Sequence, residues 1–355
     1  MPAAALRYPA TALRGFAARL LERAGLASDR AADVADILVE GDLMGHTTHG
    51  LQLLGPYLKG LEDGGITRTG APEIVADRGG TIAWDGNFLP GPWLVLRAMD
   101  AAFARIADHG VVTVAIRRAH HIACLQAYLP RATARGLVML LMSSDPATGS
   151  VVPHGAIAGR FTPNPIAAGF PTDALPVLID ISASTTTNGL VSRLNRAGKG
   201  ERLPGPWLVD NRGDASDDPA VFLTRPPGAI LPLGGMDLGH KGFGLALLVE
   251  ALTSALAGHG RAEGEKRWGA SVFVQVIDPG AFGGRDSFAR ETGWLANACR
   301  TAPVKAGHPP VRMPGERGLK LRAHQLAEGL ALHPETMPAL APWAEKLGVA
   351  EPSSS

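Results

Sequence analysis

Four short apolar runs in the middle of the chain constrain its fold more than any other feature. They are residues 111–116 (VVTVAI), 137–144 (LVMLLMSS), 175–182 (LPVLIDIS) and 271–278 (SVFVQVID). Runs of this length are typical of buried strands and are too short to cross a bilayer as helices. The stretch TIAWDG (residues 81–86) is also β-rich, and residues 93–109 and 242–257, which lie between these stretches, favour helices. Strands alternating with helices predict a mixed α/β or α+β core.

The first part of the chain and its C-terminal end are expected to be helical instead. Apolar residues at helical spacing cover residues 13–21, and Ser28 is a suitable N-cap for a second helix. A short helix is expected near residues 53–58, and another near residues 320–330 after a proline-rich stretch. The segment 190–218 is rich in Gly, Arg, Asp and Pro, so we predict a surface loop there.

Charge and cysteine usage exclude several classes of protein. The 355 residues carry a net charge of +1 with no run of five like charges, so we expect neither nucleic acid nor a membrane surface as a partner. No stretch of 18 apolar residues occurs, and Arg7, Arg14 and Arg19 interrupt any secretory-type core. Cys124 and Cys299 are too few for a disulfide framework and indicate reduced thiols in the cytoplasm.

Residues 45–50 (GHTTHG) place two histidines three residues apart, near the end of the second predicted helix. Asp42, His46 and His49 have the spacing of metal ligands on consecutive helical turns. No H-E-x-x-H motif and no further ligand cluster accompanies them, so we expect no metal. A catalytic histidine beside a hydroxyl group and a plain helix end both remain open as interpretations.

Two further stretches are ambiguous on their residues alone. His120 and His121 follow a predicted strand, where either functional residues or solvated loop histidines would fit. The dinucleotide-binding motif G-x-G-x-x-G is absent. Residues 239–244 (GHKGFG) open a predicted helix, where Lys241 would help to hold a phosphate, but an ordinary loop-to-helix turn fits equally well.

Several blocks, in chain order, resemble one known family. GDLMGHTTHGLQLLGPYL resembles the A-D-x-x-G-x-x-[ST]-H-G-x-x-R-x-x-x-Y block of the malate/L-lactate dehydrogenases that lack a Rossmann fold. RRAHHIACLQAY is similar to the N-H-F-G-x-x-G-Y segment of that family, which includes ureidoglycolate dehydrogenase and piperideine carboxylate reductase. Further similar blocks follow in the same order: MSSDPATGSVVPHG, FTPNPIAAGFPT, LIDIS, LPLGGMDLGHKGFGLALLVEAL and VRMPGER.

The resemblance implies a fold and a cofactor. The expected fold is mixed α/β, with a non-Rossmann NAD(P)-binding and substrate domain over residues 76–302 and a predominantly antiparallel sheet. A helical domain would combine residues 1–75 with residues 303–355. NAD or NADP is the implied cofactor, a small molecule the substrate, and a homodimer the implied assembly.

The resemblance also assigns roles to residues. His49 would be the acid/base, Thr48 would polarise the reacting group, and His121 would contact the substrate. Tyr57 and Asn164 are further expected substrate contacts. The expected cofactor-binding residues are His121, Ile122, Ala123, Cys124, Leu125, Ser144, Asp145, Asp180, Ile181, Ser182, Lys241, Gly242, Gly315, Glu316 and Arg317.

The chain departs from the family pattern at substrate-binding positions. Leu53 stands where the family has an arginine that binds the substrate carboxylate, Pro163 where it has a threonine, and Leu190 where it has a charged residue. Leucine offers no bidentate pairing, so either Arg160 supplies the carboxylate contact, or Arg160 is a surface residue and the substrate has no carboxylate at this point.

Three functions stay open on this sequence. The first is hydride transfer between nicotinamide and a small 2-hydroxy or 2-oxo acid. The second is the same chemistry on another alcohol or a cyclic imine. The third is a cofactor-binding protein with little catalysis, against which the retained Thr48, His49 and His121 argue.

Overall fold

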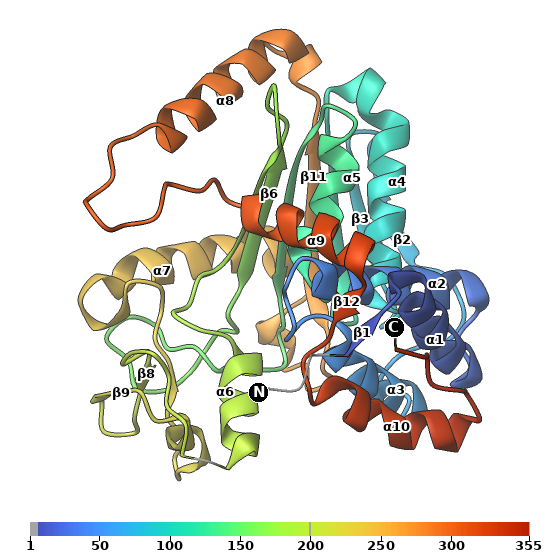
Figure 1. Ribbon diagram of the computed structural model, residues 1–355, viewed down its shortest axis with the longest axis vertical. Helices are drawn as coiled ribbons and strands as arrows, with labels where there is room; N and C mark the ends of the chain where they lie inside the picture. Colours follow the sequence, from blue (N-terminus) through green and yellow to red (C-terminus); the bar gives the residue numbers. More distant parts are fainter. Residues whose placement is uncertain (1–5, 199, 355) are drawn as a thin grey trace.

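The computed structural model describes residues 6–198 and 200–354 (Figure 1). Residues 1–5 and 355 of the expected helical domain, and residue 199 of the expected loop, lie outside the described ranges. The centre is a seven-stranded sheet in the order β2-β3-β4-β11-β5-β6-β7. Its strands are β2 (Glu73–Asp77), β3 (Thr81–Asp85), β4 (Val111–Ala119), β5 (Val138–Ser144), β6 (Pro165–Phe170), β7 (Val177–Ser182) and β11 (Ala270–Ile277).

The four apolar runs form four of these strands, β4, β5, β7 and β11, and the predicted mixed α/β class is confirmed. Strands β3 and β4 pair in parallel. The other neighbouring strands pair antiparallel, including the long pairings of β11 with β4 and with β5. The sheet is therefore mixed, with antiparallel pairing at most of its ladders.

Helices cover both faces of the sheet. Successive residues of β11 point to opposite faces, so they pack against different helices. Val272 and Val274 pack in the main core, to which α4 (Gly91–His109) also contributes. Phe273 packs instead in a separate cluster with Val249 from α7 (Gly235–Glu250). The short helix α5 (Leu129–Thr133) packs against β5 and β6.

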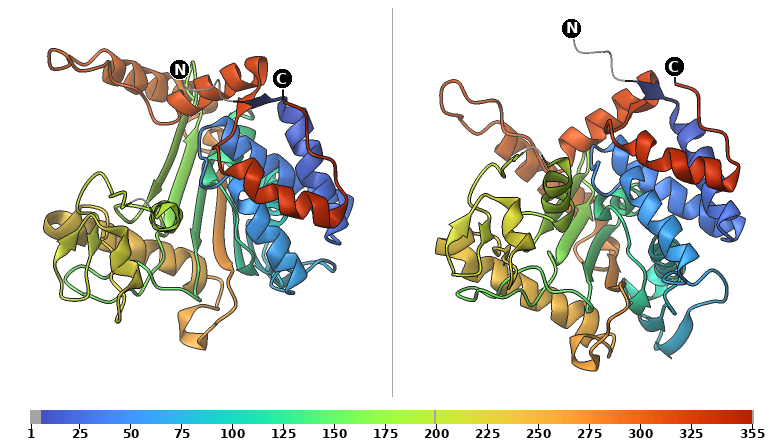
Figure 2. Two further views of the ribbon diagram at one scale, coloured as in Figure 1. Left: turned by 60° about the horizontal axis from the view of Figure 1, so that its bottom comes forward. Right: turned by 90° about the horizontal axis from the view of Figure 1, so that it is seen from below.

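The helices of the two chain ends lie side by side (Figure 2). From the N-terminal part come α1 (Ala10–Arg23), α2 (Ser28–Leu43) and α3 (Leu54–Glu62), and from the C-terminal part α9 (Glu316–Glu328) and α10 (Thr336–Leu347). Helix α2 packs against α1 and α9, and α3 packs against α10. Strands β1 (Arg7–Tyr8) and β12 (Leu330–Ala331) pair antiparallel and join the two ends.

Ser28 is the first residue of α2 and not its N-cap, a position that Ala27 occupies.

The segment 190–218 is not simply a surface loop. Helix α6 (Asn188–Ala197) covers its start, and β8 (Leu208–Val209) and β9 (Ala215–Ser216) lie in its second half. These strands form a small sheet with β10 (Ala229–Ile230). The prediction of a loop was wrong because the apolar residues of this segment are too sparse to show a helical or strand periodicity. They nevertheless pack in a separate small core, which includes Val191, Leu203, Leu208 and Ile230.

Helix α8 (Arg285–Arg300), which no sequence pattern predicted, extends beyond the sheet in Figure 1 and is followed by a long loop. Only Gly293 and Ala296 of this helix are buried, and its large apolar residues Trp294 and Leu295 are exposed, so the helix contributes little to the core. No helix within the described ranges has the length and apolar character needed to cross a membrane.

Candidate active site

A cavity of about 710 Å³ lies where five separate segments meet. They are the turn after α2, the loop after β4, the end of β5, the end of β7 and the start of α6, and further lining comes from Thr162, Pro163, Pro165, Phe222 and residues 268–270. Twelve residues expected from the resemblance line this one cavity: Thr48, His49, His121, Ile122, Ala123, Cys124, Leu125, Ser144, Asp145, Asp180, Ile181 and Ser182. The structure thus brings together most of the predicted site.

The GHTTHG stretch is a turn and not the continuation of a helix. Helix α2 ends at Leu43, and Gly45 has a positive φ of 87° that favours glycine. The buried carboxyl group of Asp42 accepts a hydrogen bond from the Leu51 N–H at 2.7 Å, which anchors the far side of the turn. Burial raises the pKa of Asp42 to about 7. Asp42 therefore holds the turn and is not grouped with His46 and His49 as a ligand set.

His49 is suited to accept a proton. Its Nδ1 lies 2.9 Å from Thr48 Oγ1, within hydrogen-bonding distance. Burial lowers the pKa of His49 to about 4, and the charges of His46 and Arg193 add to this shift. The imidazole is consequently neutral at neutral pH, and the Thr48 hydroxyl fixes its orientation.

His121 is held rigidly opposite His49, with ring centroids 6.0 Å apart. The Ala123 N–H donates to His121 Nδ1 at 3.1 Å, so the neutral ring carries its hydrogen on Nε2. Trp268 stacks on the same ring with a centroid distance of 5.3 Å and lines the cavity. Burial lowers the pKa of His121 well below its usual value, and neighbouring His49 and His120 add to this effect.

Tyr57, expected to contact substrate, acts on His121 instead. Its buried hydroxyl group donates to the carbonyl oxygen of His121 at 2.7 Å, and Tyr57 is not among the residues that line the cavity. Trp268 was missed by sequence reasoning because a single tryptophan before a strand gives no signal until the fold places it against His121. The start of α6, including Asn188 and Gly189, was missed for the same reason.

Some of the polar groups on the remaining walls have hydrogen-bond partners within the protein, and others have none among the described residues. Ser144 Oγ lies within hydrogen-bonding distance of Thr253 Oγ1 and Ser254 Oγ, at 2.8 and 3.0 Å. Two other cavity-lining atoms, Ser150 Oγ and Asn188 Oδ1, are buried and have no partner among the residues that the structure describes. A buried polar atom without a partner is costly, so these two atoms favour a polar ligand in the cavity.

Five predicted cofactor contacts lie outside the cavity lining: Lys241, Gly242, Gly315, Glu316 and Arg317. Helix α7 begins at Gly235 and not at residue 242, because Gly234, with a φ of 100°, makes the turn that precedes it. Lys241 is therefore an exposed residue inside the helix. Gly315 to Arg317 form the start of α9, where Gly315 packs closely against Leu178.

Arg160 and Asn164 do not line the cavity either, so the structure does not bring them together with the other predicted site residues. Arg160 is exposed, and its guanidinium group donates to the carbonyl oxygen of the preceding Gly159. Asn164 is fully buried, and its amide nitrogen donates to Glu250 Oε1 at 3.0 Å. Within residues 6–198 and 200–354, no lysine or arginine lines the cavity, and Leu53 contributes an apolar surface to it.

Comparison with known proteins identifies the same family as the motifs in the sequence. The family model described as malate/L-lactate dehydrogenase matches residues 8–341. An L-lactate dehydrogenase from Cupriavidus necator is 30% identical over 98% of this chain and 100% of its own length.

Two solved structures are similar over almost the whole chain. The malate dehydrogenase from Pyrococcus horikoshii has a TM-score of 0.87 and 25% identity, covering 98% of this chain and 97% of that one. The delta1-piperideine-2-carboxylate reductase from Pseudomonas syringae has a TM-score of 0.82 and 26% identity, covering 95% of this chain and 99% of that one. The resemblance drawn from the motifs is confirmed, and the chain belongs to the malate/L-lactate dehydrogenase family of oxidoreductases.

Proposed function

We propose that this protein is an NAD(P)-dependent oxidoreductase that transfers a hydride between nicotinamide and a small 2-hydroxy or 2-oxo acid. The observation that carries the proposal is that Thr48, His49 and His121 line one cavity, with His49 held neutral by burial. The similar proteins named above act on lactate, malate and a cyclic imino acid, which agrees with this class of reaction.

The cavity residues fit a nicotinamide cofactor. Ser150 Oγ and Asn188 Oδ1 are buried without partners among the described residues, so they are available to a polar ligand. The apolar stretch from Ile122 to Leu125 offers a surface for a flat ring. When bound, the cofactor would accept or supply the hydride. Neither NAD nor NADP is favoured by these contacts.

The protein's own part in the reaction is proton transfer. When His49 Nδ1–H donates to Thr48 Oγ1, the lone pair of His49 Nε2 is free for the hydroxyl proton of the substrate. The same hydrogen bond persists after protonation, because the imidazolium donates from both nitrogens. The reverse reaction returns the proton from Nε2 to the new alcohol oxygen. A positioned acid/base of this kind contributes about 10²–10⁴-fold in rate.

Leu53 favours a second candidate, the same hydride transfer on an alcohol without a carboxylate. An unpaired carboxylate in a partly desolvated cavity is costly, and the described lining residues offer no lysine or arginine to pair with it. Both candidates are tested by nicotinamide absorbance with NAD and NADP against hydroxy acids, oxo acids, cyclic imino acids and uncharged alcohols. Activity confined to uncharged alcohols selects the second candidate, and cofactor binding without any turnover would reject both.

We further propose a cytoplasmic homodimer with two domains, residues 76–302 and the combined residues 1–75 and 303–355. Both cysteines are unpaired, in keeping with a reducing compartment. The homodimer is supported by the apolar surface of α7 and the residues after it, where five large side chains are between 47% and 54% exposed: Met236, Leu238, Leu247, Leu248 and Leu256. Several large apolar side chains left exposed on one element are typical of a subunit interface.

A further inference from the structure

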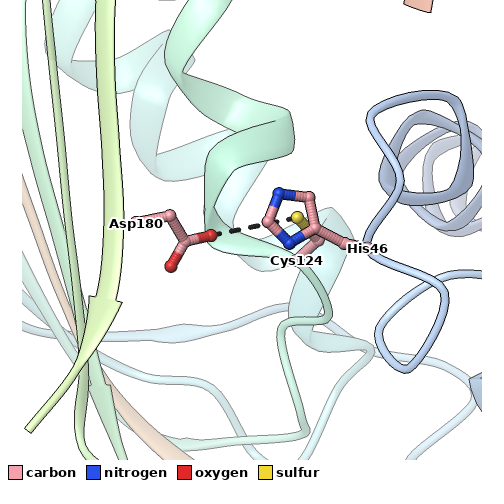
Figure 3. Close-up of side chains that lie close together, drawn as sticks. All are labelled: His46, Cys124 and Asp180. Atoms are coloured by element: carbon pink, nitrogen blue, oxygen red, sulfur yellow. Dashed lines mark hydrogen bonds between the residues drawn. The ribbon is translucent and has the colours of Figure 1, made fainter. Parts of the chain in front are cut away.

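Three potential metal ligands from three different segments converge in the cavity wall (Figure 3). They are His46 in the turn after α2, Cys124 in the loop after β4, and Asp180 in β7. One ligand atom from each lies within 4.8 Å of the other two. No local pattern groups these three residues, because they lie far apart along the chain.

We propose that His46, Cys124 and Asp180 bind one divalent transition-metal ion, with Zn²⁺ as the best-matched ion. This inference goes beyond the proposed hydride transfer, which uses no metal, and it replaces the expectation that the chain binds none. The distances are close to those that a metal requires. Cys124 Sγ and Asp180 Oδ2 lie 4.0 Å apart. Ligand atoms of a tetrahedral zinc site are separated by roughly 3.3–3.6 Å, so the Cys124–Asp180 pair needs a shift of about half an ångström, and His46, within 4.8 Å of both, must move closer as the ion binds.

Gln126 orients two of the three ligands. Its side-chain amide donates to the carbonyl oxygen of Leu178 at 2.9 Å, which fixes its Oε1 toward His46 Nε2, also at 2.9 Å. His46 therefore carries its hydrogen on Nε2, and the free lone pair of the neutral ring is on Nδ1. The Gln126 backbone N–H donates to Asp180 Oδ2 at 2.9 Å. Hydrogen bonds that fix the tautomer and direction of metal ligands are typical of built metal sites.

Among the described cavity-lining residues there is no lysine or arginine, so no permanent side-chain cation competes with an ion for these ligands. The Cys124 thiol and the Asp180 carboxyl group would lose their protons to an incoming ion, so a thiolate and a carboxylate would balance the charge of a divalent ion.

The mixture of ligands selects the class of ion. One sulfur, one imidazole nitrogen and one carboxylate oxygen suit Zn²⁺ and its spectroscopic substitute Co²⁺, whereas Mg²⁺ and Ca²⁺ prefer oxygen ligands alone. Three protein ligands leave the fourth tetrahedral position open. All three residues line the cavity, so an oxygen atom of a small ligand can fill that position.

The test uses the full-length protein, stripped with a chelator and titrated with Co²⁺. We expect one equivalent bound per chain, a thiolate-to-cobalt absorption band in the near ultraviolet, and loss of the band when Zn²⁺ is added. Cys124→Ser should abolish the band, while the matched control Cys299→Ser, which changes the other cysteine, should keep it. His46→Ala should weaken binding, and Gln126→Leu should weaken it by roughly 10–100-fold, as loss of a ligand-orienting group does.

Two outcomes would overturn the proposal: no stoichiometric Co²⁺ binding by the stripped wild type, or a band that survives Cys124→Ser. Thermal unfolding of each variant checks that it is folded. Should Cys124→Ser fail that check, His46→Ala, which changes a half-buried side chain, carries the test alone, and unchanged affinity in it rejects the site. The readout is metal binding and not turnover, so its result is independent of the proposed hydride transfer.

Discussion

His49 carries the strongest prediction for a single residue. His49→Ala should lower kcat by about 10²–10⁴-fold, because the proton acceptor is removed, while the Kd for NADH or NADPH changes little. Steady-state kinetics and fluorescence quenching by the reduced cofactor measure the two quantities. His46→Ala should cost much less turnover, and the exposed His308→Ala serves as the control without effect. Equal losses in His49→Ala and His46→Ala would mean that the wrong histidine has been assigned.

The depressed pKa of His49 sets the expected pH dependence. Alcohol oxidation needs neutral His49, whose pKa lies at about 4 because of burial and the charges of His46 and Arg193. As pH rises through about 4 the base loses its proton, so kcat/KM for oxidation should rise about tenfold per pH unit below this value and level off above it. Carbonyl reduction needs the protonated form and should decline above the same pH. Initial rates in both directions across the pH range measure the two profiles.

Replacing Arg193 should shift the pH dependence of kcat/KM. Its positive charge contributes to the low pKa of His49, so Arg193→Leu should move the ascending limb for oxidation toward higher pH. The guanidinium group of Arg193 also binds Thr47 and Gln52, so thermal unfolding of the variant must accompany the kinetics. Arg160→Leu is the matched control, because Arg160 is exposed outside the cavity, and a limb that moves equally in both variants would contradict the assignment.

The turn that follows α2 depends on close packing at Gly50. A Cβ atom at this position would lie 2.2 Å from Asp42 Cγ, so Gly50→Ala must displace the carboxyl group that anchors the turn. Overpacking of this kind costs about 1–3 kcal/mol in the free energy of unfolding. We expect a lower midpoint in chemical unfolding together with a lower kcat, because Thr48 and His49 belong to the same turn. Gly283→Ala, where a Cβ meets open space, should change neither quantity.

Elements differ in how well the sequence predicts them. The runs that became β4, β5, β7 and β11 were predictable because buried strands need unbroken apolar residues. Helix α8 was not, because it buries little. The start of α7 was misplaced because a glycine pair gives no local signal of where the helix begins.

The residues of the candidate site also differ in how well the sequence predicts them. Thr48, His49 and His121 were predictable from motif resemblance, and they line one cavity. The carboxylate contact was predicted for Arg160 only because this residue is close in sequence to the TPNP turn. Closeness along the chain does not determine the direction of a side chain, and Arg160 does not line the cavity. The grouping of His46, Cys124 and Asp180 depends on contacts between a turn, a loop and a strand, which no local pattern encodes.

At the scale of the whole molecule, the exposed apolar surface of α7 leads to a prediction about assembly. Leu247 and Leu248 are 48% and 47% exposed, and leaving such side chains in water is unfavourable when a second copy can cover them. Light scattering during size-exclusion chromatography should therefore give the mass of a dimer. The double variant Leu247→Asp and Leu248→Asp should shift the mass toward the monomer, because burying two carboxylates at an apolar interface is costly.

The control for this assembly prediction is Leu223→Asp, which places a carboxylate on a leucine that is 71% exposed outside α7. This variant should stay dimeric. Dissociation caused by Leu223→Asp would mean that added charge, and not the position of the interface, separates the subunits. A wild-type monomer at all concentrations, or a dimer that tolerates both aspartates on α7, would move the interface away from this helix and leave its apolar surface to another partner.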